Sequence, residues 1–413
     1  MELRKDFKVN IFLWFALFCF FSLVIFLLQN FLTYSDFLEG LFIPDVINMS
    51  NTFDNLKSTQ ESLISSGLFG VYAIYYLAWI THPALSIIIN LIFIYFSIKL
   101  IYEIFVKNNF TIQLVCLGLF VNPYVFLAVT GPNKEIPLIW ASLYVVRNLI
   151  LKPKRWFVKA IILSCFVFLI RDGYGVILFL ATIIFSSKIS VKLMWKIALG
   201  LAFLASILTD VLISNLSVME RNFVIAKSIN GEANSSAFIG DFLTNNTSPF
   251  FSIIKESLRM LYNWITLAIF PLFYTDTGSI YTLGFGYWIF GVFIFMCILA
   301  SLYLLVTNKA QTLIDKNQLK IVGFIVFAWS TISISLFIQP RYLMPILPLA
   351  FGILYSLSKK TRIICIFIAL FFSFSTILIY NFSGNPPAKY SINDSVYGSV
   401  RSKPSFLIFN SKD

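Results

Sequence analysis

The sequence is poor in charged residues and in histidine. Charged side chains make up 12% of its 413 residues, whereas an ordinary soluble domain carries about 25%. The single histidine, His82, excludes a His-rich metal centre. The five cysteines all lie within apolar segments, where cysteine is typical of a small buried hydrophobic residue. They therefore indicate neither a disulfide framework nor a metal cluster.

Apolar residues dominate instead, at 59% of the chain with a mean hydropathy of +0.85. So much apolar surface exceeds what a water-soluble core can bury. The composition predicts an all-α, polytopic integral membrane helical bundle, with one transmembrane domain over residues 1–383 and a polar external tail over 384–413. No small-residue cleavage site follows the first apolar run, Ile11 to Leu28, so we interpret it as a permanent span rather than a signal peptide.

The apolar runs predict about eleven transmembrane helices. They lie near residues 10–29, 83–106, 110–129, 135–151, 156–170, 174–187, 195–215, 283–306, 319–338, 343–357 and 363–382. Two further stretches, 67–81 and 258–273, are interpreted as interfacial or re-entrant helices. The first is short, rich in aromatic residues and closed by His82-Pro83, and the second contains Arg259 and a proline.

Basic residues are distributed unevenly over this layout. The segments on the N-terminal side of the membrane hold 19 of the 31 Lys and Arg residues but only 4 of the 19 acids, which leaves 12 basic and 15 acidic residues on the other side. This asymmetry follows the positive-inside rule and places the N-terminus in the cytoplasm. The long loops 30–66 and 216–257 then lie outside. The rule also accounts for the net charge of +12 without nucleic acid as a partner.

The polar hexapeptide Thr130–Glu135 separates two apolar segments. Its Gly-Pro pair ends the preceding span, and the next helix begins with its N–H groups and positive dipole end facing outward. With Lys134, these groups form a candidate phosphate site, and Glu135 is placed to act as a base or to orient Lys134. The alternative is a polar turn with an Asn133 cap and a lysine whose charge reaches back to the membrane surface.

A second motif, Arg171-Asp172-Gly173-Tyr174-Gly175, divides the apolar stretch 156–187 into two short halves. Neither half reaches the roughly 20 residues of a full crossing. A hairpin of two short helices would therefore recess Arg171 and Asp172 below the membrane surface. An arginine there is costly in free energy, which favours a role in function. Tyr174 is a candidate substrate contact. The alternative is an Arg–Asp pair that stabilises a tight turn.

The third motif, Gln339-Pro340-Arg341-Tyr342, precedes a proline-rich apolar segment. Arginine suits bidentate contact with phosphate and keeps its charge, so Arg341 is the foremost catalytic candidate and Tyr342 a substrate contact. The prolines bend the following helix and open backbone space for a ligand. An interfacial Arg-Tyr anchor is the alternative.

Residues of the external segments complete the candidate set. Asp36, in the first loop, could accept a proton from a sugar hydroxyl, and Arg221 and Arg259 could contact phosphate or glycan. Outer tyrosines such as Tyr72 and Tyr75 could stack on sugar rings. For each of these residues, a solvated or lipid-facing side chain without a role in catalysis is the alternative.

Together, the hexapeptide after the third span, Arg171 in a short hairpin and Arg341-Tyr342 before a proline-rich span resemble bacterial O-antigen and capsule repeat-unit polymerases (the Wzy type). More broadly, the pattern is similar to the GT-C superfamily of multi-spanning glycosyltransferases, which use polyprenyl-phosphate donors. The resemblance implies a protein of the bacterial inner membrane with its active face in the periplasm.

The implied reaction transfers a growing glycan from undecaprenyl pyrophosphate to a new lipid-linked repeat unit. Arg341, Arg171 and Lys134 would neutralise the pyrophosphate leaving group. Glu135, Asp172 or Asp36 would activate the acceptor hydroxyl, without a metal or other cofactor. The resemblance also implies a flippase and a chain-length regulator as partners. A single-sugar transferase, an O-antigen ligase and a polysaccharide transporter are the alternatives, the first weakened because the first loop lacks a clear paired-acid motif.

Overall fold

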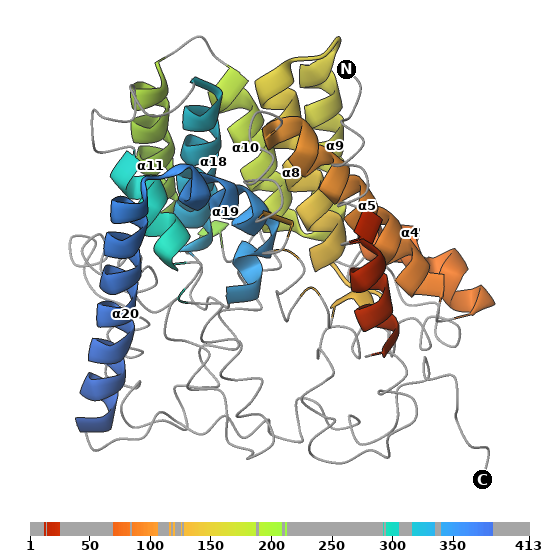
Figure 1. Ribbon diagram of the computed structural model, residues 1–413. Coiled ribbons are helices and arrows are strands. Elements are labelled where there is room, and N and C mark those ends of the chain that lie inside the picture. Colours follow the sequence, from red (N-terminus) through yellow and green to blue (C-terminus); the bar gives the residue numbers. More distant parts are fainter. Residues whose placement is uncertain are drawn as a thin grey trace.

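The computed structural model places helices on nearly every part of the chain that it describes (Figure 1). The described residues are 12–13, 15–24, 69–82, 85–105, 115–116, 119, 125, 128–186, 190–208, 211–212, 292, 295–304, 316–334 and 340–382. These residues contain no β-strand. The all-α class is therefore confirmed for this part of the chain. The loops 30–66 and 216–257 that were predicted to be external, the stretch 258–273 and the tail 384–413 lie outside it.

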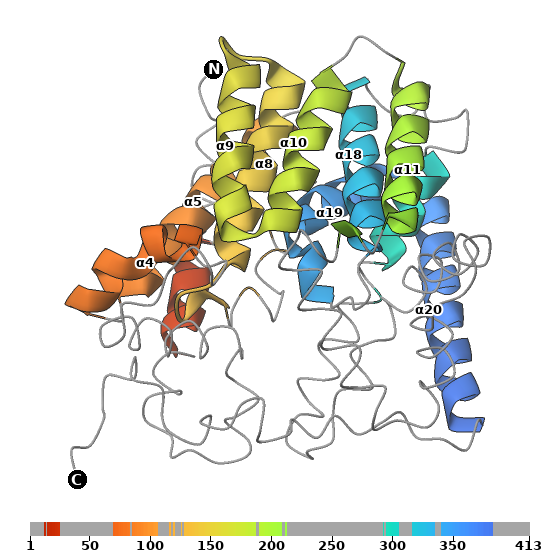
Figure 2. The same ribbon diagram turned by 180° about the vertical axis from the view of Figure 1, so that it is seen from behind.

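Three antiparallel helices form the centre of the bundle: α8 (Glu135–Leu151), α9 (Trp156–Ile170) and α10 (Asp172–Ser186). Figures 1 and 2 show them side by side from both directions. A short turn joins α8 to α9, with Lys152 and Arg155 in the left-handed region at φ 45° and 58°. A single extended residue, Arg171, joins α9 to α10. The start of α8 and the α9–α10 junction consequently lie at the same end of the three helices.

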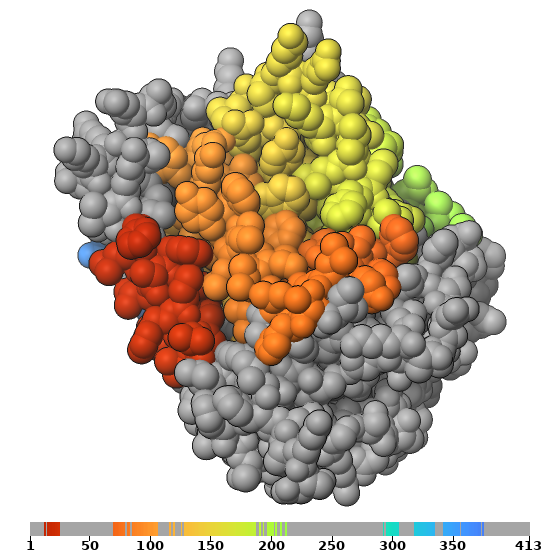
Figure 3. Space-filling view, turned by 90° about the vertical axis from the view of Figure 1, so that its right-hand side faces the viewer, coloured from red at the N-terminus to blue at the C-terminus, as the bar shows by residue number. Residues whose placement is uncertain are grey.

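Helices α4 (Phe69–Thr81) and α5 (Leu85–Phe105) pack against this centre, α4 on α9 and α5 on α8. Figure 3 shows α4 crossing below the yellow α8–α9 pair, next to the first helical segment in red. Phe15 of that segment meets Tyr95 of α5 at 5.7 Å between ring centroids. The stretch predicted as an interfacial or re-entrant helix is thus a helix packed into the bundle, with Val71 and Tyr75 fully buried.

The other side of the bundle contains α11 (Val191–Ile207), α18 (Lys316–Ile332), η2 (Pro340–Ile346), α19 (Leu347–Ser356) and α20 (Lys359–Phe382). Helix α18 packs on α10 and α11, and η2 packs on α8 and α18. The span predicted at 343–357 is not one α-helix. It begins as the 3₁₀ segment η2, with Pro345 inside it, and continues as α19 from Leu347. Proline lacks the N–H that an α-helix would need there.

Two glycines allow the helices around Arg171 to approach closely. A Cβ on Gly175 of α10 would lie 2.4 Å from the Cα of Phe168 in α9, and a Cβ on Gly70 of α4 would lie 2.7 Å from the backbone N of Ile170. Real side chains cannot occupy such positions without moving the backbone. Glycine at both sites therefore lets α4, α9 and α10 converge beside the α9–α10 junction.

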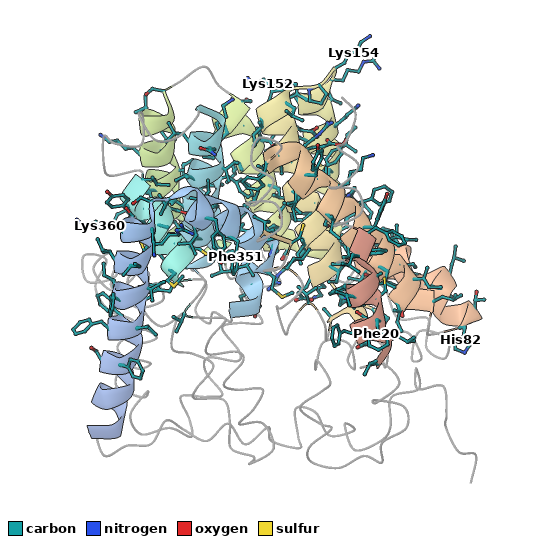
Figure 4. The ribbon with its side chains drawn as sticks, in the orientation of Figure 1. Phe20, His82, Lys152, Lys154, Phe351 and Lys360 are labelled. Carbon is teal, nitrogen blue, oxygen red and sulfur yellow. The ribbon has the colours of Figure 1, made fainter. Side chains whose placement is uncertain are left out.

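Length and composition qualify one described helix, α5, to cross a membrane. Shorter apolar helices of 10–17 residues include α9 and α10. The apolar runs at 135–151 and 156–170 coincide with α8 and α9, so the helices are confirmed there. The number of membrane crossings stays a prediction. Figure 4 shows Lys152 and Lys154 at the upper end of the bundle and Lys360, at the start of α20, about halfway down.

Candidate functional site

A buried acid–base pair joins two of the three sequence motifs. Arg171 Nη1 lies 3.8 Å from Glu135 Oε1, and the two side chains are only 12% and 4% exposed. Burying either charge alone would be costly, so each stabilises the other. At 3.8 Å the contact is an ion pair but too long for a hydrogen bond. The sequence alone left open whether Glu135 orients Lys134 and whether Arg171 pairs with Asp172; the structure places Glu135 and Arg171 together.

The Glu135 carboxylate is the least satisfied group of the pair. Both of its oxygens are buried and have no hydrogen-bond partner in the described structure. The position at the start of α8 favours a negative charge because of the helix dipole. A carboxylate with two unused acceptor oxygens can receive a hydrogen bond, or a proton, from a hydroxyl brought next to it.

Arg171 is fixed both through its backbone and through its side chain. Its N–H donates to Val167 O at 2.8 Å, and its carbonyl accepts from the N–H groups of Tyr174 and Gly175 at 3.1 and 3.0 Å. Its guanidinium Cζ lies 4.2 Å from the ring centroid of Tyr342 in η2. A guanidinium on an aromatic face is attracted by the ring quadrupole, so Tyr342 holds Arg171 in place. The cluster of Glu135, Arg171 and Tyr342 thus contains a residue from each motif.

Asn133 acts as a helix cap. Its Oδ1 accepts from the N–H of Ile136 at 2.9 Å, and its Nδ2 donates to the carbonyls of Ala128 and Gly131. Asn133 is fully buried and its amide is engaged on both sides. We therefore give it a structural role and do not retain it as a substrate contact.

These hydrogen bonds also occupy backbone N–H groups of the phosphate site that was predicted at the start of α8. The N–H of Ile136 is taken by Asn133, and that of Leu138 donates to Lys134 O at 3.2 Å. Pro137 has no N–H to offer. The first turn of α8 thus has little left to bind an anion, and the arrangement matches the alternative of a capped polar turn. Lys134 is half-buried just before this turn.

A second polar network supports the same turn from α4 and α5. Tyr75 Oη donates to Asn90 Oδ1 at 2.5 Å. Asn90 Nδ2 in turn reaches the carbonyls of Ala128, Val129 and Gly131 at 3.4, 3.0 and 2.8 Å. The prediction that Tyr75 stacks on a sugar ring at the rim does not fit, because its side chain is fully buried. Sequence reasoning missed Asn90, whose signal was an amide inside an otherwise apolar run.

The remaining residues of the second motif are occupied locally. Tyr174 is buried, and its hydroxyl lies 3.1 Å from Ser142 Oγ, which donates to it. We therefore assign Tyr174 to packing between α8 and α10 rather than to substrate. Asp172 Oδ1 accepts from the N–H of Gly173 at 2.7 Å in the first turn of α10. Asp172 is partly exposed beside Arg171.

The other predicted site residues are covered only in part. Arg341 precedes Tyr342 in η2, which places its backbone next to the cluster; its side chain lies outside the described part of the structure. Asp36, Arg221 and Arg259 also fall outside the described residues.

A different ion pair lies at the far end of α8. Arg147 Nε contacts Glu103 Oε2 of α5 at 2.6 Å, and these side chains are 25% and 27% exposed. Beyond it, Lys152 Nζ lies 5.5 Å from the ring centroid of Trp156. This pair is hydrogen-bonded, unlike the Glu135–Arg171 pair, and needs no further partner.

Within the described ranges, no group of three or more His, Cys, Asp or Glu side chains is placed to share a metal ion. Comparison with known proteins finds no matching family model, no curated relative and no similar solved structure. The cluster of Glu135, Arg171 and Tyr342 offers a carboxylate able to accept a proton and a fixed cation able to stabilise a negative charge.

Proposed function

We propose that the chain is a polytopic membrane protein that joins lipid-linked oligosaccharide repeat units into a longer glycan. The observation that carries this proposal is the Glu135–Arg171–Tyr342 cluster. In it, a buried carboxylate whose two oxygens accept no hydrogen bond lies beside a cation that stacks on an aromatic ring. Transfer of a glycan from a polyprenyl pyrophosphate needs a group that accepts the hydroxyl proton and a cation for the leaving group. The cluster can supply both.

The outer surface of the bundle supports the membrane part of the proposal. Phe367 and Phe371 of α20 are 69% and 68% exposed, and Ile162 of α9 is 64% exposed. Soluble monomers rarely expose large contiguous apolar patches, whereas lipid-facing helices must. The buried polar residues, including Asn90 and Glu135, face the interior instead. The proposed location is the bacterial inner membrane, with the cluster toward the periplasm.

In the proposed reaction, a hydroxyl of the acceptor repeat unit attacks the anomeric carbon of the donor glycan. A new carbon–oxygen bond forms as the bond from that carbon to the pyrophosphate oxygen breaks. The electron pair leaves with undecaprenyl pyrophosphate, whose charge is stabilised by Arg171 and Arg341. The hydroxyl proton passes to Glu135. A flippase would deliver the substrate, and a chain-length regulator would be a further partner.

The test uses a strain that lacks this gene and is complemented with variants of the full chain. We expect Arg341→Ala to abolish the long polysaccharide ladder on a gel while the protein still inserts into the membrane. Lys159→Gln is the matched control, because it removes an exposed cation from α9 without touching the cluster. An unchanged ladder for Arg341→Ala would overturn the role of Arg341.

The wild-type product separates the alternative functions in the same experiment. A single-sugar transferase would extend the glycan by one residue and give no ladder. An O-antigen ligase would be revealed by lipid-linked polymer that accumulates when the gene is missing. A transporter would lose polymer equally when residues along a central path are neutralised. Each of these results would replace the polymerase proposal.

A further inference from the structure

We infer that Asn90 and Tyr75 are positioning residues for Glu135, which they serve by fixing the turn immediately before it. This inference rests on the proposed function for its kinetic consequence. The geometry that points to it is independent of any substrate. Both residues lie on helices outside the three sequence motifs, Tyr75 on α4 and Asn90 on α5.

The side-chain amide of Asn90 makes hydrogen bonds through both its oxygen and its nitrogen. Its Oδ1 accepts from the Tyr75 hydroxyl at 2.5 Å. Its Nδ2 faces the carbonyls of Ala128, Val129 and Gly131, the last at 2.8 Å. The side chain is fully buried within the one described helix that is long enough to span a membrane. An amide in such a helix is tolerated when its polar atoms find partners, and here the partners are the Tyr75 hydroxyl and backbone carbonyls of the turn.

The turn held by Asn90 leads directly to the reactive carboxylate. Asn133 donates to the carbonyls of Ala128 and Gly131 as well, and its Oδ1 caps α8 through the N–H of Ile136. The carbonyls of Ala128 and Gly131 therefore accept hydrogen bonds from two amides, that of Asn90 in α5 and that of Asn133 in the turn itself. Tyr75 is also close enough to Glu135 to interact with it electrostatically.

This arrangement ties the position of Glu135 to α4 and α5. The contact between Glu135 and Arg171 has no hydrogen bond of its own to fix it, since it is 3.8 Å long. Its geometry must be set by the backbone at the start of α8 and at the α9–α10 junction. Without the Asn90 amide, the carbonyls of Ala128 to Gly131 lose a donor, the turn relaxes, and the Glu135 carboxylate moves relative to Arg171. A shift of about 1 Å in a catalytic group can lower a rate by up to about 100-fold.

The experiment compares three full-length variants purified in detergent. Asn90→Leu removes the amide at similar volume, and Tyr75→Phe removes only the hydroxyl that Asn90 accepts. Ser97→Ala is the matched control, because Ser97 is also fully buried in α5 but donates only to Phe93 O of its own helix. If Asn90→Leu fails to fold, Tyr75→Phe decides the matter alone.

The first measurement reads the geometry of Glu135 without any substrate. A hydrophobic carbodiimide labels the carboxyl groups that it can reach, and peptide mass spectrometry reports how fast Glu135 is labelled. In the wild type the Glu135 side chain is only 4% exposed beside Arg171, and a turn that relaxes opens it to the reagent. We therefore expect labelling of Glu135 to accelerate about fivefold in Asn90→Leu and Tyr75→Phe, as in Arg171→Gln. Ser97→Ala should match the wild type.

The second measurement is the rate of polymerisation on a lipid-linked repeat unit. Asn90→Leu should lower kcat by about 10- to 100-fold with little change in KM, because it displaces a catalytic group without touching substrate. Unchanged labelling in Asn90→Leu and Tyr75→Phe would overturn the inference, and so would faster labelling with unchanged kcat. A wild-type protein without polymerising activity would overturn the proposed function, and the labelling result would still decide whether Asn90 and Tyr75 position Glu135.

Discussion

The guanidinium of Arg171 lies over the ring of Tyr342, with its Cζ 4.2 Å from the ring centroid. The two residues are far apart in the sequence, one at the α9–α10 junction and the other in η2. Their contact, together with the ion pair between Arg171 and Glu135, makes one cluster out of three separate polar interruptions in an apolar chain.

The stacking contact predicts a difference between two substitutions of Tyr342. Tyr342→Phe keeps the ring face, so Arg171 should stay in place and the polysaccharide ladder should remain near the wild-type length. Tyr342→Leu removes the ring, and we expect activity to fall about fivefold or more, since a desolvated cation–π contact contributes about 1–2 kcal/mol. In vitro transfer rates check this. Equal rates for the two variants would show that the ring does not hold Arg171.

Substituting Arg171 itself should separate charge from shape. Arg171→Lys keeps the positive charge but loses the planar fork and its stacking on Tyr342. We expect Arg171→Lys to lose most transfer activity and Arg171→Ala to lose all detectable ladder. Lys159→Gln, in the preceding helix α9, should retain both activity and membrane insertion. Full activity in Arg171→Lys would mean that only the charge is needed.

Neutralising Glu135 tests its role as the proton acceptor. Glu135→Gln preserves the volume of the side chain and removes its charge, while Arg171 keeps its contact with the ring of Tyr342. A general base contributes about 10²- to 10⁴-fold to a rate, and we expect a loss of kcat in that range. The measurement is single-turnover transfer with purified protein. A loss of less than about tenfold would assign the proton to another group.

Close packing at the α9–α10 hairpin predicts a stability effect. A Cβ at Gly175 would meet the backbone of Phe168, whereas a Cβ at Gly173 would meet nothing within 4 Å. Gly175→Ala should therefore force α9 and α10 apart and destabilise the protein by about 1–3 kcal/mol. Gly173→Ala should leave it unchanged. Thermal unfolding in detergent compares the two, and equal midpoints would contradict the packing described here.

The pair at the other end of α8 should matter for stability and not for transfer. Glu103 and Arg147 are about one quarter exposed, so breaking the pair should cost no more than about 1 kcal/mol. We expect Glu103→Gln and Arg147→Gln to keep normal ladders. Loss of polymer in both variants, with unchanged stability, would point to a charged path through the bundle and thus to transport.

Much of the helix layout could be predicted from the sequence, because strong local signals mark the ends of the helices. The apolar runs on either side of Pro153, 135–151 and 156–170, have the bounds of α8 and α9, whereas the run predicted at 174–187 corresponds to α10, which begins two residues earlier at Asp172. The stretch at 343–357 was predicted less well, since proline at 345 turns its first part into η2. A hydropathy pattern detects the apolar run but not the change of helix type.

Side-chain partners were harder to predict than helices. The three motifs were expected to line one site, and the structure brings Glu135, Arg171 and Tyr342 together; their role in catalysis stays a prediction. The pairing of Glu135 with Arg171, instead of with Lys134, depends on how α8 packs beside the α9–α10 hairpin. Asn90 escaped notice because an uncharged amide barely alters the hydropathy of an apolar run. Its hydrogen bonds reach residues about forty positions away, which no local pattern reveals.

We propose that the Glu135–Arg171–Tyr342 cluster transfers a glycan from a polyprenyl pyrophosphate. The most direct measurement incubates the purified full chain with a synthetic undecaprenyl-pyrophosphate-linked repeat unit and follows both glycan length and released undecaprenyl pyrophosphate. We expect a ladder for the wild type, with one undecaprenyl pyrophosphate released for each bond formed, and neither product for Arg171→Ala or Glu135→Gln. Equal product formation by the wild type and these two variants, or none by a folded wild type, would overturn this proposal.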